Sequence, residues 1–304
     1  MIGPIQDYAT IGIVHFMMWK SCIRGEGDFG PALNFLEHPY FGGMELSWVH
    51  DGAMRRRIAA DATRYKKRLS FGAQPVLLTQ QLDINHLDEA ERRKAVDAVC
   101  AVVPQAAELG ARGFALLSGK VVPPEHKSKA LEQLIRSLVE IGRHVKEHTD
   151  IPLVLETFDQ LTYGKNCLIG SHKDAAIVAK EVRTVLKDFG LLVDLSHLPL
   201  QGESVAEAWD AAGEYVVHAH MGNCVMNQPD HPMNGDEHPP LCDPAGENCT
   251  DELVEFLRVL RREGFLHTDR KPFLSFEVTP YGEWTPETLL AQCQQVLDDA
   301  WALV

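Results

Sequence analysis

Long apolar runs are missing from this sequence, since none approaches the roughly 18 residues needed to span a bilayer. Residues 10–19 are apolar enough to resemble the hydrophobic part of a signal peptide. However, no lysine or arginine precedes them, and His15 interrupts them. We therefore interpret residues 10–19 as a first strand and expect no contact with a membrane.

Positive charge and paired cysteines are also scarce. The chain has 29 lysines and arginines against 43 aspartates and glutamates, and its net charge of −14 would repel a phosphate backbone. We therefore expect no nucleic-acid partner. The seven cysteines include no CxxC pair, and their odd number and scattered positions predict reduced thiols in a cytoplasmic protein.

A glycine-rich phosphate turn is absent as well, because no GxGxxG occurs in the chain. Its absence argues against a doubly wound α/β sheet as the fold, because that fold usually carries such a turn after its first strand. Strand-like and helix-like segments alternate along the whole chain and predict eight strand–helix units. We therefore predict an α/β protein whose residues 1–304 form a single-domain (β/α)8 TIM barrel. The expected strands are residues 10–19, 43–48, 75–80, 114–117, 152–157, 191–195, 216–220 and 272–278.

Capping signals mark several of the expected helices. Ser204 and Glu207 have the spacing of a capping box, and so do Asp88 and Glu91. Gly110 suits the end of the helix that begins after Asp88. Helices are expected, among other places, over residues 52–69, 89–109 and 174–187.

Four chemically active residues stand at the far ends of apolar runs on four successive expected strands. They are Glu156, Asp194, His220 and Glu277. A buried carboxylate is normally tolerated only when it is paired or bound to a cation, and parallel strands of a barrel end at the same face. Three carboxylates and one imidazole suit Mn²⁺, Mg²⁺ or Co²⁺ better than a structural zinc site. The pattern predicts one divalent metal ion, with separate buried ion pairs as the competing interpretation.

The segments around these four residues carry a family resemblance. They read Leu153-Val154-Leu155-Glu156-Thr157, Val193-Asp194-Leu195-Ser196-His197, His218-Ala219-His220-Met221-Gly222-Asn223 and Ser275-Phe276-Glu277-Val278. They resemble the metal motifs of the xylose-isomerase-like barrels, which include sugar epimerases, hydroxypyruvate isomerase, inosose dehydratase and AP endonucleases of the DNA-repair branch. The resemblance covers strands five to eight.

The resemblance implies a role for each matching residue. Glu156, Asp194, His220 and Glu277 would bind the ion, with Mn²⁺ expected first and Mg²⁺, Co²⁺ or Zn²⁺ as alternatives. Glu156 and Glu277 would also be the catalytic proton-transfer pair, and His197 would bind a substrate oxygen. The implied activity is a sugar isomerase or epimerase that removes a proton next to a carbonyl through a metal-stabilised enediolate. Its partner would be a small carbohydrate or keto-sugar.

Two departures from the sugar epimerases leave a second activity open. Those enzymes usually carry a second glutamate six residues after the first and an arginine six residues after the metal histidine. This chain has Thr162 and Met226 at these positions. Both positions bind substrate hydroxyls in the family, so a different sugar or orientation is implied. The alternative is a lyase or dehydratase that eliminates a β-substituent from a keto-sugar, a keto-cyclitol or a 3-keto-glycoside.

Two further classes compete with these enzymes. The DNA-repair branch needs three metals and histidines after strands three and four, where this chain has Leu78-Thr79-Gln80 and Leu117-Ser118-Gly119. Together with the acidic charge, this disfavours an AP endonuclease. A non-catalytic scaffold subunit that works with a partner chain is the other alternative. A homo-oligomer is also compatible with the sequence, which locates no interface.

The loop at residues 221–249 is unusually long for a compact domain and contains five prolines. Such loops are often lids or binding elements, so we predict a lid over the metal, with a surface excursion or subunit contact as the alternative. Asp236 and His238 are its predicted substrate contacts.

Three single residues are left with two interpretations each. His15 could line the pocket or be a core histidine. Glu45 could belong to the ring at the barrel mouth or be the buried partner of an arginine. Lys120 could stabilise an oxyanion or be an exposed loop lysine.

Overall fold

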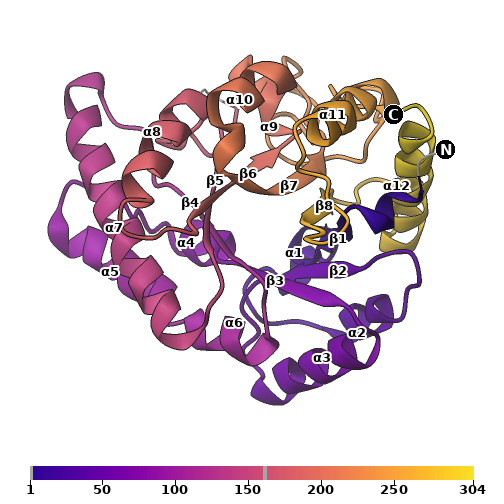
Figure 1. Ribbon diagram of the computed structural model, residues 1–304, viewed down its shortest axis with the longest axis horizontal. Helices are drawn as coiled ribbons and strands as arrows, with labels where there is room; N and C mark the ends of the chain where they lie inside the picture. Colours follow the sequence, from indigo (N-terminus) through magenta and orange to yellow (C-terminus); the bar gives the residue numbers. More distant parts are fainter. Residues whose placement is uncertain (1–2, 160–162) are drawn as a thin grey trace.

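Eight parallel strands close into a barrel in the computed structural model, which describes residues 3–159 and 163–304 (Figure 1). The strands follow one another around the barrel in chain order, and β8 pairs with β1. The predicted (β/α)8 TIM barrel is therefore confirmed. The strands are β1 (Thr10–Val14), β2 (Gly43–Leu46), β3 (Arg68–Gly72), β4 (Phe114–Leu117), β5 (Leu153–Glu156), β6 (Gly190–Asp194), β7 (Val216–Gly222) and β8 (Phe273–Glu277).

Most of the helices surround the barrel as an outer ring (Figure 1). The helices are α1 (His15–Met18), α2 (Gly30–Leu36), α3 (Gly52–Arg64), α4 (Gln74–Gln80), α5 (Glu89–Cys100), α6 (Val103–Leu109), α7 (Lys127–His148), α8 (His172–Val182), α9 (His197–Gln201), α10 (Val205–Ala212), α11 (Thr250–Arg262) and α12 (Pro286–Trp301). The short helices α1, α4 and α9 directly follow strands β1, β3 and β6. Short 3-10 helices are η1 (Ile5–Asp7), η2 (Lys20–Cys22), η3 (Pro124–His126) and η4 (Gly213–Tyr215). Within the described ranges, no helix has the length and apolar character to cross a membrane.

Alternation along the strands decides which side chains enter the barrel. Leu153 and Leu155 of β5 belong to the large hydrophobic core, whereas Val154 packs in a separate small cluster with Ala115 and Leu192. Because successive strand residues point to opposite faces, Glu156 lies on the same face as Val154. Two-residue spacing therefore places the strand-end residues on the inside of the barrel.

The third strand was predicted at the wrong place. Residues 75–80 lie in α4, and β3 runs from Arg68 to Gly72 instead, paired with β2 and β4. Pro75 occupies the first turn of α4, where its missing N–H costs nothing, whereas a central strand would need that donor. The expected helix 52–69 correspondingly ends early, at Arg64.

The expected helix 89–109 is also two helices. Asp88 caps α5 through hydrogen bonds from Ala90 N and Glu91 N, and Gly110 in the left-handed conformation ends α6. Between them the chain breaks because Pro104 is in the first turn of α6, and a proline inside a continuous helix would remove a hydrogen bond. The Ser204–Glu207 capping box is confirmed in α10. The helix expected at 174–187 is α8, and the first strand is shorter than expected because α1 follows it at once.

The prediction that the thiols are reduced is wrong for two of the seven cysteines. Cys242 and Cys249 form a disulfide at the end of the loop that follows β7. Cys249 is the N-cap of α11, so the bond joins this loop to the start of a helix. Scattered sequence positions could not reveal this pair, because no CxxC spacing signals it. The free cysteines are Cys22, Cys100, Cys167, Cys224 and Cys293.

Candidate metal centre

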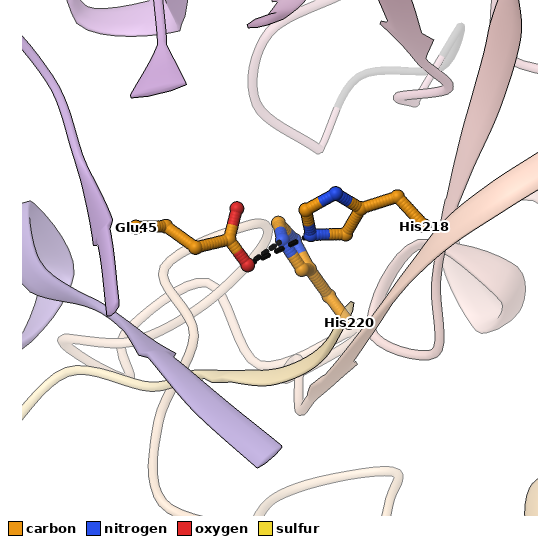
Figure 2. A group of neighbouring side chains, drawn as sticks. All are labelled: Glu45, His218 and His220. Atoms are coloured by element: carbon orange, nitrogen blue, oxygen red, sulfur yellow. Dashed lines mark hydrogen bonds and ion pairs between the residues drawn. The ribbon is translucent and has the colours of Figure 1, made fainter. Parts of the chain in front are cut away.

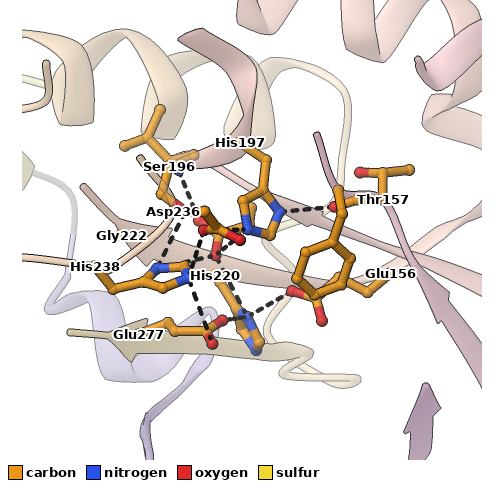
Figure 3. A network of polar contacts seen from close by, with 12 residues as sticks. Glu156, Thr157, Ser196, His197, His220, Gly222, Asp236, His238 and Glu277 are labelled. Carbon is orange, nitrogen blue, oxygen red and sulfur yellow. Dashed lines mark hydrogen bonds and ion pairs between the residues drawn. The ribbon is translucent and has the colours of Figure 1, made fainter. Parts of the chain in front are cut away.

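Four side chains meet at the carboxyl end of the barrel. They are Glu156 of β5, Asp194 of β6, His220 of β7 and Glu277 of β8, and their exposed fractions are 1%, 0%, 2% and 7%. Figure 3 shows Glu156, His220 and Glu277 pointing toward one another. From His220 Nδ1 the distances are 2.6 Å to Glu277 Oε2, 3.4 Å to Glu156 Oε1 and 3.8 Å to Asp194 Oδ2. The four residues that the strand ends singled out therefore lie together.

The facing atoms of this group fit a cation. The atoms Glu156 Oε1, Asp194 Oδ2, His220 Nδ1 and Glu277 Oε2 are buried and make no hydrogen bond. Even the short approach of His220 Nδ1 to Glu277 Oε2 lacks hydrogen-bond geometry. Unpaired buried polar atoms are costly, whereas one ion between them could be coordinated by all four residues. Three carboxylate oxygens and one imidazole nitrogen suit a divalent ion.

Protons and positive charge balance the carboxylates in this structure. Burial alone would lower the pKa of His220, but the charges of Glu45 and Glu277 outweigh it and raise this pKa well above its usual value. Burial alone would raise the pKa of Glu277. The charges of His238 and His220 outweigh burial, so that the pKa of Glu277 is lowered. A divalent ion would replace the proton on His220, because a ligating histidine must be neutral.

Three of these four residues are oriented by a further contact with a residue outside the group. Gln74 Nε2 donates to Glu156 Oε2 at 2.7 Å, and Ser196 N donates to Asp194 Oδ1 at 2.7 Å. His220 Nε2 lies 3.2 Å from Glu45 Oε1. In each case, the atom that faces the group is left free for an ion.

A second cluster lies beside the first, and it contains the three residues predicted to contact substrate. His197 Nε2 lies 3.1 Å and His238 Nε2 2.8 Å from Asp236 Oδ1 (Figure 3). His197 Nδ1 donates to the carbonyl of Thr157 at 2.7 Å. Both partners of His197 can only accept, so this ring carries two protons. The tertiary structure therefore brings His197, Asp236 and His238 together; their contact with substrate stays a prediction.

Charge pairing maintains this second cluster. Burial would raise the pKa of Asp236, but Lys165, His197 and His238 outweigh it and hold this pKa well below its usual range. The Lys165 Nζ lies 2.7 Å from Asp236 Oδ2. Burial would lower the pKa of His197, but the charges of Asp236 and Asp194 prevail and raise it to about 10.

A cavity of about 210 Å³ opens onto the candidate metal centre. Its polar lining residues include Glu156, His220, Glu277 and Lys165. Its apolar lining residues are Val14, Phe16, Met17, Ile23, Leu78 and Phe158. A larger hollow of about 350 Å³ is lined by Arg68, Arg112 and residues next to β8, and it includes none of the four residues. The smaller cavity is therefore the candidate substrate pocket.

The sequence missed several residues of this pocket. Gln74 follows β3, which was misplaced, and Lys165 lies between β5 and α8 with no motif around it. Glu45 does line the pocket, but its partners are His218 and His220 rather than an arginine. In the sequence, His218 stands only as part of the motif around His220.

For the other single residues, the structure decides between the two interpretations. His15 is a core histidine that stacks on Phe29, with ring centroids 5.3 Å apart. Lys120 is an exposed loop lysine whose Nζ donates to the carbonyl of Lys165. Met226 is half-buried and outside the residues that line the pocket, and Thr162 lies outside the described residues.

No histidine directly follows the described strands β3 and β4. The described strands β3 and β4 end at Gly72 and Leu117, and the next polar side chains are Gln74 and Ser118.

Comparison with known proteins places this geometry among related barrels. The sequence model described as the xylose isomerase-like TIM barrel matches residues 40–299. No curated protein sequence matches the chain. Among solved structures, the D-psicose 3-epimerase of Clostridium cellulolyticum H10 with D-tagatose is 15% identical, and the alignment covers 97% of this chain and 99% of that one with a TM-score of 0.68.

Two more solved structures are similar. The 3-keto-D-glucoside 4-epimerase of E. coli is 13% identical, with 95% of this chain and 98% of that one covered and a TM-score of 0.65. The IolI protein with a binding zinc atom is 13% identical, with 97% and 99% covered and a TM-score of 0.71. At these identities the likeness demonstrates a shared fold.

Proposed function

The chain belongs to the xylose isomerase-like TIM barrel family, and on this basis we propose that it is a divalent-metal-dependent isomerase or epimerase of a sugar. One observation carries the proposal. Four buried ligand atoms without hydrogen bonds, from four successive strands, converge at one end of the barrel, and three of the four residues line the pocket. Solved sugar epimerases with the same fold, and a zinc-bound relative, support the assignment.

Four residues would hold the ion. They are Glu156, Asp194, His220 and Glu277, whose free atoms face one another. When bound, a divalent cation would polarise a substrate carbonyl and acidify the neighbouring C–H. Mn²⁺ is the first candidate because the donor set is rich in oxygen, and Mg²⁺, Co²⁺ and Zn²⁺ follow.

Glu156 and Glu277 are the proposed acid–base pair. Each carboxylate lines the pocket, and they come from strands on either side of β6 and β7. One carboxylate would take the proton from the carbon next to the carbonyl, and the substrate would become an enediolate. The other would return a proton to the substrate, which completes an isomerisation or an epimerisation.

The second cluster would bind substrate oxygens. His197 carries two protons between Thr157 O and Asp236, and His238 lies on the other side of Asp236. Asp236 lines the pocket, and we propose that it binds a hydroxyl group of the substrate. His197 and His238 are not among the lining residues, and we propose that they contact the substrate by exchanging one of their present contacts for a substrate oxygen. Asp236 and His238 belong to the segment after β7, which would act as the lid of the pocket.

A lyase is the second candidate, and the apolar lining residues of the pocket favour it. Phe16, Met17, Ile23 and Leu78 offer little to a sugar that carries only hydroxyl groups. They would suit the apolar leaving group of a 3-keto-glycoside. The first step would be the same proton abstraction, after which the β-substituent would leave with its bonding electrons in place of reprotonation.

One experiment tests both candidates. Metal-loaded protein is incubated in D₂O with a panel of keto-sugars, keto-cyclitols and aryl 3-keto-glycosides, and the products are followed by NMR and mass spectrometry. Deuterium at the carbon next to the carbonyl, with all groups retained, supports isomerase or epimerase activity. A released leaving group supports the lyase. The absence of exchange and release with the whole panel, in protein shown to contain its metal, would overturn both.

A further inference from the structure

A buried carboxylate and a second histidine stand behind the candidate ligand His220. Glu45 lies on β2 and is 3% exposed, and His218 and His220 lie on β7, on the opposite side of the barrel interior. Figure 2 shows both histidine rings pointing at the Glu45 carboxylate. Its Oε1 lies 2.8 Å from His218 Nε2 and 3.2 Å from His220 Nε2. No sequence motif links these two strands.

The two nitrogens of His220 have separate neighbours. Nε2 faces Glu45, whereas Nδ1 faces Glu156, Asp194 and Glu277. A carboxylate oxygen accepts a hydrogen bond, so Glu45 favours the tautomer that carries its proton on Nε2. That tautomer leaves the lone pair of Nδ1 directed at the candidate metal centre.

His218 holds Glu45 in this position. It shares the inward face of β7 with His220, because the two residues are two apart on one strand. Its ring stacks on Phe273, with centroids 5.3 Å apart and planes at 15°, so its orientation is restricted. It contacts the same oxygen of Glu45 as His220 does and thereby limits the rotation of the carboxylate.

We propose that Glu45 and His218 are positioning residues: Glu45 sets the tautomer and orientation of His220 for metal binding, and His218 anchors Glu45. Carboxylates behind ligating histidines also make the imidazole a stronger donor, and their loss typically lowers metal affinity about 10- to 100-fold. This inference rests on the proposed function, because it takes His220 to be a metal ligand. It adds two residues that lie outside the predicted ligand set.

Metal affinity tests the inference without any substrate. Mn²⁺ binding is measured by calorimetry on the wild type and on Glu45→Gln, which keeps the size of the side chain and removes its charge. We expect a loss of affinity of about 10- to 100-fold. Glu203→Gln is the matched control, since Glu203 Oε2 lies 2.7 Å from Nδ1 of the buried His172, which is not a candidate ligand. It should bind Mn²⁺ within about twofold of the wild type. Melting curves confirm that each variant is folded.

A double-mutant cycle tests the anchoring role. If His218 acts through Glu45, His218→Gln lowers affinity by less than Glu45→Gln, and the double variant loses no more than Glu45→Gln alone. Additive losses would show that His218 acts independently and would overturn its assignment. The His218→Gln variant also provides an answer if Glu45→Gln does not fold.

The tautomer provides a readout that a purely structural role would not change. Nitrogen NMR of histidine-labelled, Zn²⁺-loaded protein should show His220 protonated at Nε2 in the wild type and a mixed or altered signal in Glu45→Gln. Unchanged affinity and an unchanged tautomer in Glu45→Gln would overturn the inference and leave the metal centre standing. A wild type that binds no divalent metal would overturn the metal centre and the inference together.

Discussion

Lys165 Nζ lies 2.7 Å from Asp236 Oδ2 and joins two segments that are far apart in the sequence. Lys165 lies between β5 and α8, and Asp236 lies in the segment after β7. Lys165 also donates to the backbone carbonyl of Asp236 at 2.8 Å. Because Asp236 also faces His197 and His238, this lysine supports the cluster that is proposed to bind the substrate.

Removal of Lys165 should therefore loosen this cluster. In Lys165→Met, the fully buried Asp236 carboxylate loses its main cation, and we expect a loss of stability of about 3 kcal/mol. Chemical denaturation measures the effect. Lys20→Met is the matched control, because Lys20 pairs with Glu237 of the same segment at 3.4 Å in an exposed position and should contribute under about 1 kcal/mol. Equal losses in both variants would contradict the role of Lys165.

Metal should stabilise the folded chain. A divalent ion at about 100 times its dissociation constant adds about 2.7 kcal/mol if it binds only the folded state, and the melting temperature should rise by about 5 °C. Differential scanning calorimetry with Mn²⁺ and with excess chelator measures this shift. It should disappear in Asp194→Asn and persist in Asp174→Asn, since Asp174 pairs with Lys127 near the surface. A shift that survives in Asp194→Asn would place the ion elsewhere.

His15 should make the protein sensitive to mild acid. Burial lowers the pKa of His15 from 6.5 to about 3, and its Nε2 has no hydrogen-bond partner. Since the unfolded chain binds this proton more readily, stability is lost as the pH falls from 6.5 toward 3, by about 2 kcal/mol at pH 5. In His15→Phe, the stability difference between pH 7.5 and pH 5 should shrink by about this amount. Denaturation curves at both pH values check it, and the same acid sensitivity in the variant would exclude His15 as the cause.

The disulfide should stabilise the segment after β7. Cys242 and Cys249 are seven residues apart, and closing a loop of this length contributes about 2 kcal/mol through the unfolded chain. Buried Asn223 and Asn248 also hold the segment, since Asn223 Oδ1 accepts from Asn248 N at 2.8 Å. We therefore expect Cys242→Ser with Cys249→Ser to lower the free energy of unfolding by about this amount and to leave the barrel folded. Reductant should reproduce the loss in the wild type and have little effect on the double variant.

Part of the fold could be predicted from the sequence because the signals for it are local. Alternating apolar segments predicted the barrel, and capping residues such as Ser204 and Asp88 marked helix starts. The strand β3 was not predicted because its apolar run is short, and the apolar run after Pro75 is the more prominent one. The break between α5 and α6 was not predicted either, although Pro104 indicates it.

By itself, the sequence determined that Glu156, Asp194, His220 and Glu277 would meet. Glu156, Asp194 and Glu277 end parallel strands and His220 lies two residues before the end of β7, and a closed barrel brings the carboxyl ends of its strands to one face. Only the tertiary structure decided that Lys165 pairs with Asp236 and that Glu45 lies behind His220. These contacts join segments whose distance in space depends on loop paths and on packing across the barrel, and no local pattern in a chain encodes that distance.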